Sequence, residues 1–180
     1  LGKLYFAEGR FAEVEPLFKR SLALKEKALG PDHPSVGNTV NNLAFLYVRQ
    51  RRYAEAEPLY QRSLALYEKV LGPDHLSVAT ALNNLAALYQ NQGHYTKAEP
   101  LFKRALALRE KVLGPDHPDV AGSLNNLGGL YRQQGRDDAA EPLYKRAVSI
   151  AEHTLGSEHP NVSTGLHNLA TLAFSRRDWV

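Results

Sequence analysis

Apolar residues recur every three to four positions in two stripes within residues 36–71. Such spacing puts each stripe on one face of an α-helix, so the segment predicts two amphipathic helices. Arg51 and Arg52 interrupt the apolar pattern between the stripes, and Gly72 followed by Pro73 marks the end of the second helix. We therefore expect a helical hairpin here, and no part of the sequence shows the strict alternation that predicts a β-strand.

The same hairpin recurs along the chain with a period of 42 residues. Aligning residues 53–94 with residues 95–136 gives 27 identical positions out of 42, a similarity that chance does not produce. The junction Leu-Gly-Pro-Asp-His-Pro, or a variant of it, occurs four times, beginning at Leu29, Leu71, Leu113 and Leu155. We expect one repeat domain over residues 1–180, with units at 1–33 (partial), 34–75, 76–117, 118–159 and 160–180 (partial).

A unit of two helices cannot bury both of its apolar stripes alone. Stacking on neighbouring units buries them, so the repeat predicts an all-α solenoid of stacked antiparallel helix pairs. We expect about nine helical segments: a stub near 1–9, three complete first helices, four long second helices and a last first helix near 160–176. The alternative is a single globular bundle whose units are similar by accident.

One motif within each unit resembles the tetratricopeptide repeat. It reads Asn-Leu-Ala at 84–86 with Tyr89 three residues later, then Gln-Gly-His-Tyr at 92–95 and Ala98 three residues after that. The period of 42 instead of the ordinary 34 residues, together with the junction, is similar to the longer repeats of kinesin light chains and of bacterial proteins with kinesin-light-chain-like repeats. This resemblance covers essentially the whole chain and implies a right-handed superhelical solenoid.

The phase of the repeat at the two ends suggests a fragment. The chain has no methionine, Leu1 aligns with Leu43 in the middle of a first helix, and Trp179 aligns with Tyr53 at the start of a second helix. We therefore expect a piece of a longer repeat protein. The close similarity between units and the frequent Ala, Leu, Arg and Gly favour a bacterial source.

Composition and charge narrow the class of protein. The chain is 43% hydrophobic and 23% charged, with a net charge of only +3 from 22 basic and 19 acidic residues. No apolar run approaches the ~20 residues that cross a bilayer, and no signal-peptide pattern opens the chain, so we expect a cytoplasmic protein without membrane contact. Glu residues precede the basic pairs of the second helices by one turn, which favours a solvated outer face over nucleic-acid binding.

Candidate catalytic and metal-binding residues are few. The absence of cysteine excludes thiolate metal sites and a cysteine nucleophile. One histidine occurs at each junction, but successive repeats are about 10 Å apart, too far to share one ion, so helix capping or turn packing is favoured for His33, His75, His117 and His159. No nucleophile elbow and no phosphate-binding glycine loop is present. We expect no enzymatic activity, no metal and no cofactor.

The resemblance implies that the first helices line a concave groove in which an extended peptide binds. The peptide-binding candidates on that wall are Asn38, Asn41, Asn42, Phe45, Arg49, Asn83, Asn84, Asn91, Asn125, Asn126, Arg132, His167 and Asn168. Nine of the ten asparagines of the chain lie on this wall, and no acidic residue does. Since asparagine is a mediocre helix former, helix propensity does not explain this concentration.

A ladder of carboxamides has a chemical use in such a groove. Each carboxamide offers a donor and an acceptor, which match the backbone amides of an extended peptide. The family's peptide-contacting asparagine is matched most directly by Asn42, Asn84, Asn126 and Asn168. The alternative is that some of these side chains pack between helices as structural hydrogen-bond partners.

The charge and shape of the expected groove indicate its ligand. Arg49 and Arg132 stand at the rim and Phe45 is expected to be exposed, so we expect a protein or peptide partner with an aromatic or hydrophobic residue flanked by acids. The alternative function is a structural or assembly solenoid that spaces other domains or self-associates through its truncated ends.

Overall fold

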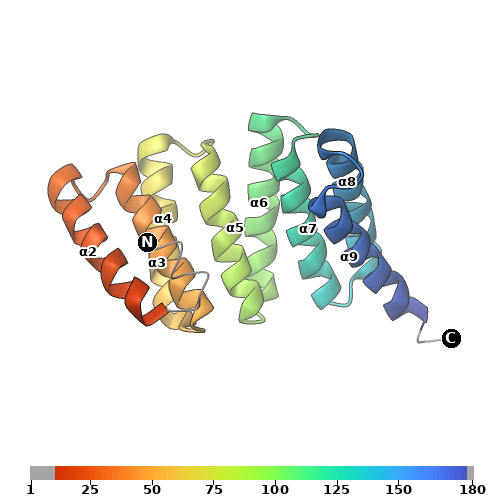
Figure 1. Ribbon diagram of the computed structural model, residues 1–180, viewed down its shortest axis with the longest axis horizontal. Coiled ribbons are helices and arrows are strands. Elements are labelled where there is room, and N and C mark those ends of the chain that lie inside the picture. The colour runs from red at the N-terminus through yellow and green to blue at the C-terminus, as the bar shows by residue number, and fades with distance from the viewer. Residues whose placement is uncertain (1–10, 178–180) are drawn as a thin grey trace. The chain divides into compact units, whose positions relative to one another are not determined.

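The computed structural model describes residues 11–177, and within that range the chain consists of helices joined by short loops, with no β-strand (Figure 1). The helices are α2 (Phe11–Leu29), α3 (Pro34–Arg49), α4 (Tyr53–Leu71), α5 (Leu76–Asn91), α6 (Tyr95–Leu113), α7 (Pro118–Gln133), α8 (Asp137–Leu155) and α9 (Pro160–Arg177). The predicted all-α fold of helix pairs is confirmed. Eight of the nine expected segments are observed, and the expected stub near 1–9 lies outside the described residues.

The helix ends are explained by the residues at the junctions. The second helix α4 ends at Gly72, whose φ of +86° is a left-handed conformation that favours glycine. The first helix α3 begins after His33, whose Nδ1 accepts a hydrogen bond from the backbone N–H of Ser35 at 3.1 Å. The same cap is made at the other junctions by His75, His117 and His159. The junction histidines therefore cap helices, as the sequence indicated.

Contacts between residues divide the chain into two compact units, residues 1–88 and residues 89–180, and the boundary falls within α5. Among residues 11–177, no helix is both long and apolar enough to cross a membrane.

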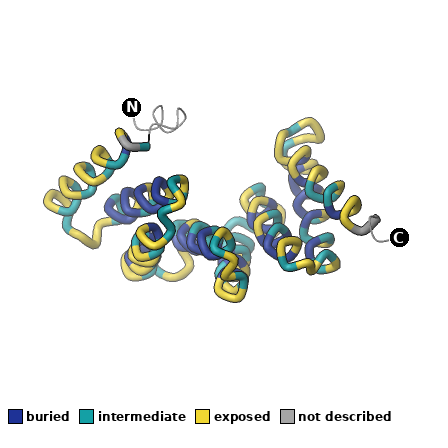
Figure 2. Tube along the Cα trace, turned by 90° about the horizontal axis from the view of Figure 1, so that it is seen from below, coloured by how far each residue is buried: buried dark blue, intermediate teal, exposed yellow. Residues whose placement is uncertain are grey.

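In the first unit, α3 packs against both α2 and α4. The apolar stripe of α3 supplies fully buried residues such as Val36, Val40 and Leu46, and α4 contributes Tyr60, which is 2% exposed. In α2, by contrast, most side chains are at least partly exposed, and Val14 is its one buried residue among those described (Figure 2). Burying a large aliphatic side chain stabilises the fold by about 1.5–3 kcal/mol, so α3 and α4 provide most of the core of this unit.

In the second unit, α7 packs against α6 and α8, and α8 packs against α9. The main core cluster is formed by Val120, Ala121, Leu124, Ala147 and Ile150. A second cluster, formed by Val148, Ala151 and Val162, joins α8 to α9. Each cluster joins a first helix to a second helix, so the core of this unit continues from α7 through α8 to α9.

Candidate peptide-binding surface on the first helices

The residues predicted to bind peptide all lie on the first helices and none of them is buried. The half-buried ones are Asn41, Asn83, Asn84, Asn125 and Asn168. The exposed ones are Asn38, Asn42, Phe45, Arg49, Asn91, Asn126, Arg132 and His167. The positions are therefore accessible on each unit, which is the first requirement for a binding surface.

A pocket of about 460 Å³ lies on the first unit and brings three of these residues together. Its lining consists of Asn38, Asn41 and Asn42 of α3, Tyr67 of α4, and Leu76, Ser77 and Thr80 of α5. None of the seven carries a charged side chain, and six of them offer hydrogen-bonding groups in the side chain. The pocket therefore suits an uncharged polar ligand such as peptide main chain.

Tyr67 is the lining residue that sequence reasoning did not assign to the site. It belongs to the apolar stripe of α4 and is 4% exposed, but its hydroxyl donates a hydrogen bond to Asn38 Oδ1 at 2.5 Å. Burial raises the pKa of Tyr67, so the hydroxyl stays protonated and remains a donor. Because Asn38 accepts with its oxygen, its amide nitrogen is oriented to donate to another group.

Two asparagine pairs bridge successive first helices. Asn84 Nδ2 donates to Asn41 Oδ1 at 3.0 Å, and this bond joins α5 to α3. In the second unit Asn168 Nδ2 donates to Asn125 Oδ1 at 3.5 Å and joins α9 to α7. These four side chains have the structural role that the sequence left open as an alternative. The carbonyl oxygens of the two donors and the amide nitrogens of the two acceptors remain available to a ligand.

The other candidates on α3 lie away from the pocket. Phe45 is 43% exposed and Arg49 is exposed near the end of the helix, and neither lines the pocket. They offer an apolar group and a positive charge on the same helix as Asn42. The structure therefore separates the first-unit candidates into a neutral pocket and a basic, aromatic end of α3.

In the second unit, α7 carries Arg132 beside a buried tyrosine. Burial raises the pKa of Tyr144, and the charge and hydrogen bonding of Arg132 offset part of that rise. Near them, a Cβ added at Gly129 would lie 3.7 Å from the hydroxyl oxygen of Tyr144 and 3.9 Å from Gln90 Nε2. The surface around Gly129 therefore combines a cation with polar groups that can bind a ligand.

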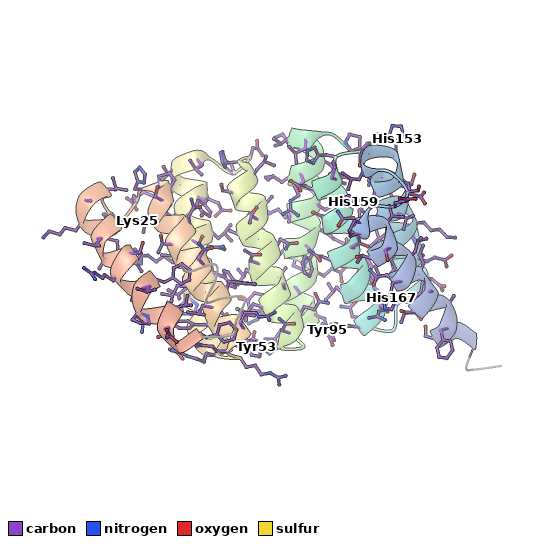
Figure 3. The ribbon with its side chains drawn as sticks, in the orientation of Figure 1. Lys25, Tyr53, Tyr95, His153, His159 and His167 are labelled. Atoms are coloured by element: carbon purple, nitrogen blue, oxygen red, sulfur yellow. The ribbon has the colours of Figure 1, made fainter. Side chains whose placement is uncertain are left out.

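His167 belongs to α9, in the second unit (Figure 3). It lines an open depression of about 510 Å³ together with Glu158, His159 and Leu166. Within the described residues, no three His, Asp or Glu side chains gather as metal ligands do. His159, the other histidine of this depression, uses its Nδ1 to cap α9.

The chain consists of repeated helical hairpins that carry carboxamides on the exposed face of their first helices. This architecture is that of a helical-repeat scaffold protein. The tetratricopeptide repeat model matches residues 1–69, 35–111, 77–153 and 119–179. The chain belongs to the tetratricopeptide repeat family, as its motifs predicted. The fold of this family is generally a non-catalytic scaffold for protein interactions.

Solved structures similar to this chain include kinesin-light-chain-like proteins. The crystal structure of BtubC (BKLC) from P. vanneervenii has a TM-score of 0.86 and 27% identity, covering 99% of this chain and 71% of that chain. A putative kinesin light chain of Podosopora anserina with nearly identical TPR-like repeats has a TM-score of 0.83 and 28% identity, covering 99% and 85%. No curated protein sequence matches the chain significantly.

One more distant structure shows the fold alone. The apo form of RapI has a TM-score of 0.82 but only 13% identity, and the match covers 99% of this chain and 62% of that chain. The kinesin-light-chain-like class expected from the 42-residue period is thus supported by the more similar structures.

Proposed function

We propose that the chain is a non-catalytic module whose first helices bind an extended peptide segment of a partner protein. The observation that carries the proposal is the uncharged, hydrogen-bonding pocket on the first unit, with Asn38, Asn41 and Asn42 along one side. An extended peptide presents its N–H and C=O groups alternately, and carboxamides can pair with both. Binding of this kind depends little on the peptide's sequence, so the surrounding side chains supply the selectivity.

The pocket is held in place by contacts that do not need the ligand. Tyr67 orients Asn38, and Asn84 orients Asn41, through the hydrogen bonds described above. A side chain that is already fixed loses less conformational entropy when a peptide binds. Asn42, which is exposed, is the carboxamide of the pocket that is best placed to contact a peptide without a structural cost.

We propose a partner segment with an aromatic or hydrophobic residue flanked by acids. Arg49 and Arg132 are exposed on α3 and α7, and Phe45 presents an apolar surface beside the first of them. None of the residues predicted for the wall is acidic, so an acidic peptide meets no like charge there.

We also propose that the module works in the cytoplasm. Fractionation of cells that express the parent protein tests this location.

The test uses fluorescent peptides with a central Trp, flanked either by Asp and Glu or by Lys. We expect binding of the acidic peptide, measured by fluorescence anisotropy at low protein concentration, and little binding of the Lys peptide. Asn42→Ala should weaken binding about fivefold, as loss of one hydrogen bond of ~1 kcal/mol predicts. The matched control is Asn161→Ala, since Asn161 is an exposed asparagine of α9 outside the predicted wall.

Two results would contradict the proposal. Unchanged affinity in Asn42→Ala, with an unchanged circular dichroism spectrum, would show that the pocket is not part of the binding site. Equal binding of the acidic and the Lys peptides would show that the arginines do not determine which peptide binds.

A further inference from the structure

Arg109 of α6 is a half-buried cation that makes few hydrogen bonds. Its guanidinium donates to Ser123 Oγ of α7 at 2.5 Å, and the Ser123 hydroxyl in turn donates to the carbonyl oxygen of Asp119 at 3.2 Å. A guanidinium has five N–H donors. Among the described residues, Ser123 is the one hydrogen-bond partner of Arg109. Arg109 therefore keeps donors free beside the first two turns of α7.

The charge of Arg109 also lacks a close carboxylate within the described part of the chain. Glu110, the next residue of α6, pairs with Arg146 of α8 at 2.6 Å. The carboxylate of Asp119 lies 3.9 Å from His117 Nδ1 and forms no ion pair with Arg109. Burial lowers the pKa of Arg109, and the charge of Asp119 offsets only part of this effect. A carboxylate that binds the guanidinium would compensate for the cost of burying its charge.

The same repeat position in the first unit shows what is particular to Arg109. Lys25, which lies 84 residues earlier, donates to Thr39 Oγ1 at 2.7 Å and to the carbonyl oxygen of Ser35 at 3.4 Å. The ammonium group of Lys25 thus uses two of its three donors within the fold. Arg109 uses one donor group of its five on a described residue, so more of its hydrogen-bonding capacity remains for a ligand.

The surface of α7 next to this contact is open. Gly122, the residue before Ser123, is exposed, and a Cβ added there would have no atom within 4 Å. The equivalent residue of the first unit is Asn38, whose carboxamide accepts a hydrogen bond from the Tyr67 hydroxyl. Glycine in place of asparagine therefore leaves the surface beside Ser123 accessible to a ligand.

We propose that Arg109 is a carboxylate-binding subsite, which takes an acidic side chain, Asp or Glu, of the partner segment. A guanidinium donates two parallel N–H groups to the two oxygens of a carboxylate, so its geometry matches this ligand. The choice of ligand rests on the proposed function, in which acids flank the aromatic residue of the peptide. Because Arg109 is half-buried, its ion pair is screened less by salt than those of the exposed Arg49 and Arg132.

The first test uses short peptides, so it does not require the asparagine pocket. The probes are a Glu-Ser-Glu peptide with both ends capped, its capped Gln-Ser-Gln counterpart, and a neutral tripeptide with a free C-terminal carboxylate. Each is titrated into the isotope-labelled chain while NMR follows the Nε–H signal of Arg109, which is assigned by its absence in Arg109→Gln. We expect a saturable shift of this signal with the capped acidic peptide and none with the Gln counterpart.

The outcomes separate this subsite from the proposed function. Absence of the Arg109 shift in a chain that binds the long acidic Trp peptide would overturn the subsite and leave the proposed function intact. The shift without binding of the long peptide would do the reverse. A response to the free C-terminal carboxylate but not to the capped acidic peptide would overturn the assignment to an acidic side chain.

Variants test the guanidinium itself, with the backbone amide signal of Ser123 reporting binding of the capped acidic peptide. Arg109→Gln should weaken binding about tenfold, as loss of hydrogen bonds between charged groups predicts. Arg109→Lys should lie between the two, because the fold accommodates Lys25 at the same repeat position but an ammonium lacks the planar pair of donors. Asp119→Asn should strengthen binding about twofold, since it removes an acid whose charge acts on Arg109.

Arg104→Gln is the matched control. Arg104 is an exposed arginine of α6, so this substitution removes the same charge from the same helix. It should change the affinity for the capped acidic peptide by less than about twofold. Circular dichroism establishes that each variant is folded. Equal losses of affinity in Arg104→Gln and Arg109→Gln, full affinity in a folded Arg109→Gln, or weaker binding in Asp119→Asn would each overturn the subsite.

Discussion

The carboxylate of Glu15 in α2 accepts a hydrogen bond from the hydroxyl of Tyr47 in α3, with an O–O distance of 3.1 Å. Arg52, just before α4, donates to the same carboxylate at 2.6 Å, and its guanidinium lies 4.0 Å from the centre of the Tyr47 ring. One carboxylate therefore joins the second helix of one repeat to both helices of the next. We call this arrangement of Glu, Tyr and Arg the inter-repeat clamp.

The clamp occurs again 84 residues later, in the second unit. Glu99 of α6 accepts from the Tyr131 hydroxyl at 3.1 Å and from Arg136 at 2.9 Å, and the Arg136 guanidinium lies 4.1 Å from the Tyr131 ring centre. Lys103 completes the site with an ion pair to Glu99 at 2.7 Å. Because the same geometry occurs in both units, we infer that the clamp stabilises the stacking of repeats.

Removing one hydroxyl tests the contribution of the clamp to stability. Tyr131→Phe should lower the free energy of unfolding by about 1–2 kcal/mol, since it removes a hydrogen bond to a charged group and leaves the ring in place. Urea denaturation followed by circular dichroism measures the change. Tyr95→Phe is the control, because the Tyr95 hydroxyl makes no hydrogen bond within the described residues, and it should change stability by less than about 0.5 kcal/mol. Equal effects of the two substitutions would contradict the role of the clamp.

The clamp also predicts how stability depends on pH. Hydrogen bonds from Arg52 and then from Lys19 lower the pKa of Glu15 from its ordinary 4.5 to about 2. A pKa lowered in the folded state means that the carboxylate stabilises the fold fully above pH ~4.5, and that this contribution is lost as the pH falls towards ~2. The difference in unfolding free energy between the native chain and Glu15→Gln should therefore be larger at pH 7 than at pH 3. Parallel pH profiles of the two proteins would contradict this assignment.

One repeat has an incomplete version of the same arrangement. Gln50 Oε1 accepts from Arg52 at 2.7 Å, and Gln134 Oε1 accepts from Arg136 at 2.9 Å. The repeat between them has His94 in place of the arginine, and the buried Gln92 Oε1 there has no hydrogen-bond partner among the described residues. The unpaired oxygen is explained by this single substitution of the repeat pattern.

Restoring the arginine should therefore stabilise the protein. His94→Arg should raise the free energy of unfolding by about 1 kcal/mol, through a hydrogen bond to Gln92 and a cation–π contact with Tyr89, whose ring centre lies 6.4 Å from that of His94. Thermal or urea denaturation measures the gain. His94→Leu should give no such gain, and the gain of His94→Arg should shrink in a Gln92→Leu background. A gain that persists in that background would show that the hydrogen bond is not its source.

Most of the fold was predictable from the sequence because its determinants are local and repeated. The period of 42, the apolar stripes and the Gly-Pro junctions place the second helix at Tyr53–Leu71, where it is observed. The sequence left open whether His75 caps the next helix or packs in the turn, because both roles fit a histidine at the junction. The structure shows His75 Nδ1 as the acceptor for the N–H of Ser77.

The candidate site was predictable only in part. The repeat places Asn41 and Asn84 at neighbouring positions of successive first helices, but whether they bond to each other depends on side-chain conformation and on the spacing of the helices. Tyr67 belongs to the apolar stripe of α4, and the stripe does not show that its hydroxyl reaches Asn38. The partners of Glu15 lie about 32–37 residues away along the chain, so no local pattern in the sequence reveals the clamp.

Two glycines of α7 have opposite reasons for being glycine. A Cβ at Gly128 would lie 2.8 Å from Cε1 of the buried Tyr144, so the packing of α7 on α8 requires glycine there. A Cβ at Gly122 would have no atom within 4 Å, and this position is exposed on α7, three residues before the peptide-binding candidate Asn125. Glycine inside a helix is less stable than alanine by roughly 0.5–1 kcal/mol, so Gly122 has a cost that packing does not explain.

Replacing each glycine by alanine separates these two reasons. Gly122→Ala should raise the free energy of unfolding by about 0.5–1 kcal/mol, because it removes backbone freedom from the unfolded chain and meets no neighbour. Gly128→Ala should lower it by roughly 1–3 kcal/mol, because the Tyr144 ring must move. If the open surface at Gly122 admits a bound peptide, Gly122→Ala should weaken binding while it stabilises the fold. Stabilisation with unchanged affinity for the acidic peptide would place the ligand away from this part of α7, and a loss of stability in Gly122→Ala would contradict the observed free space.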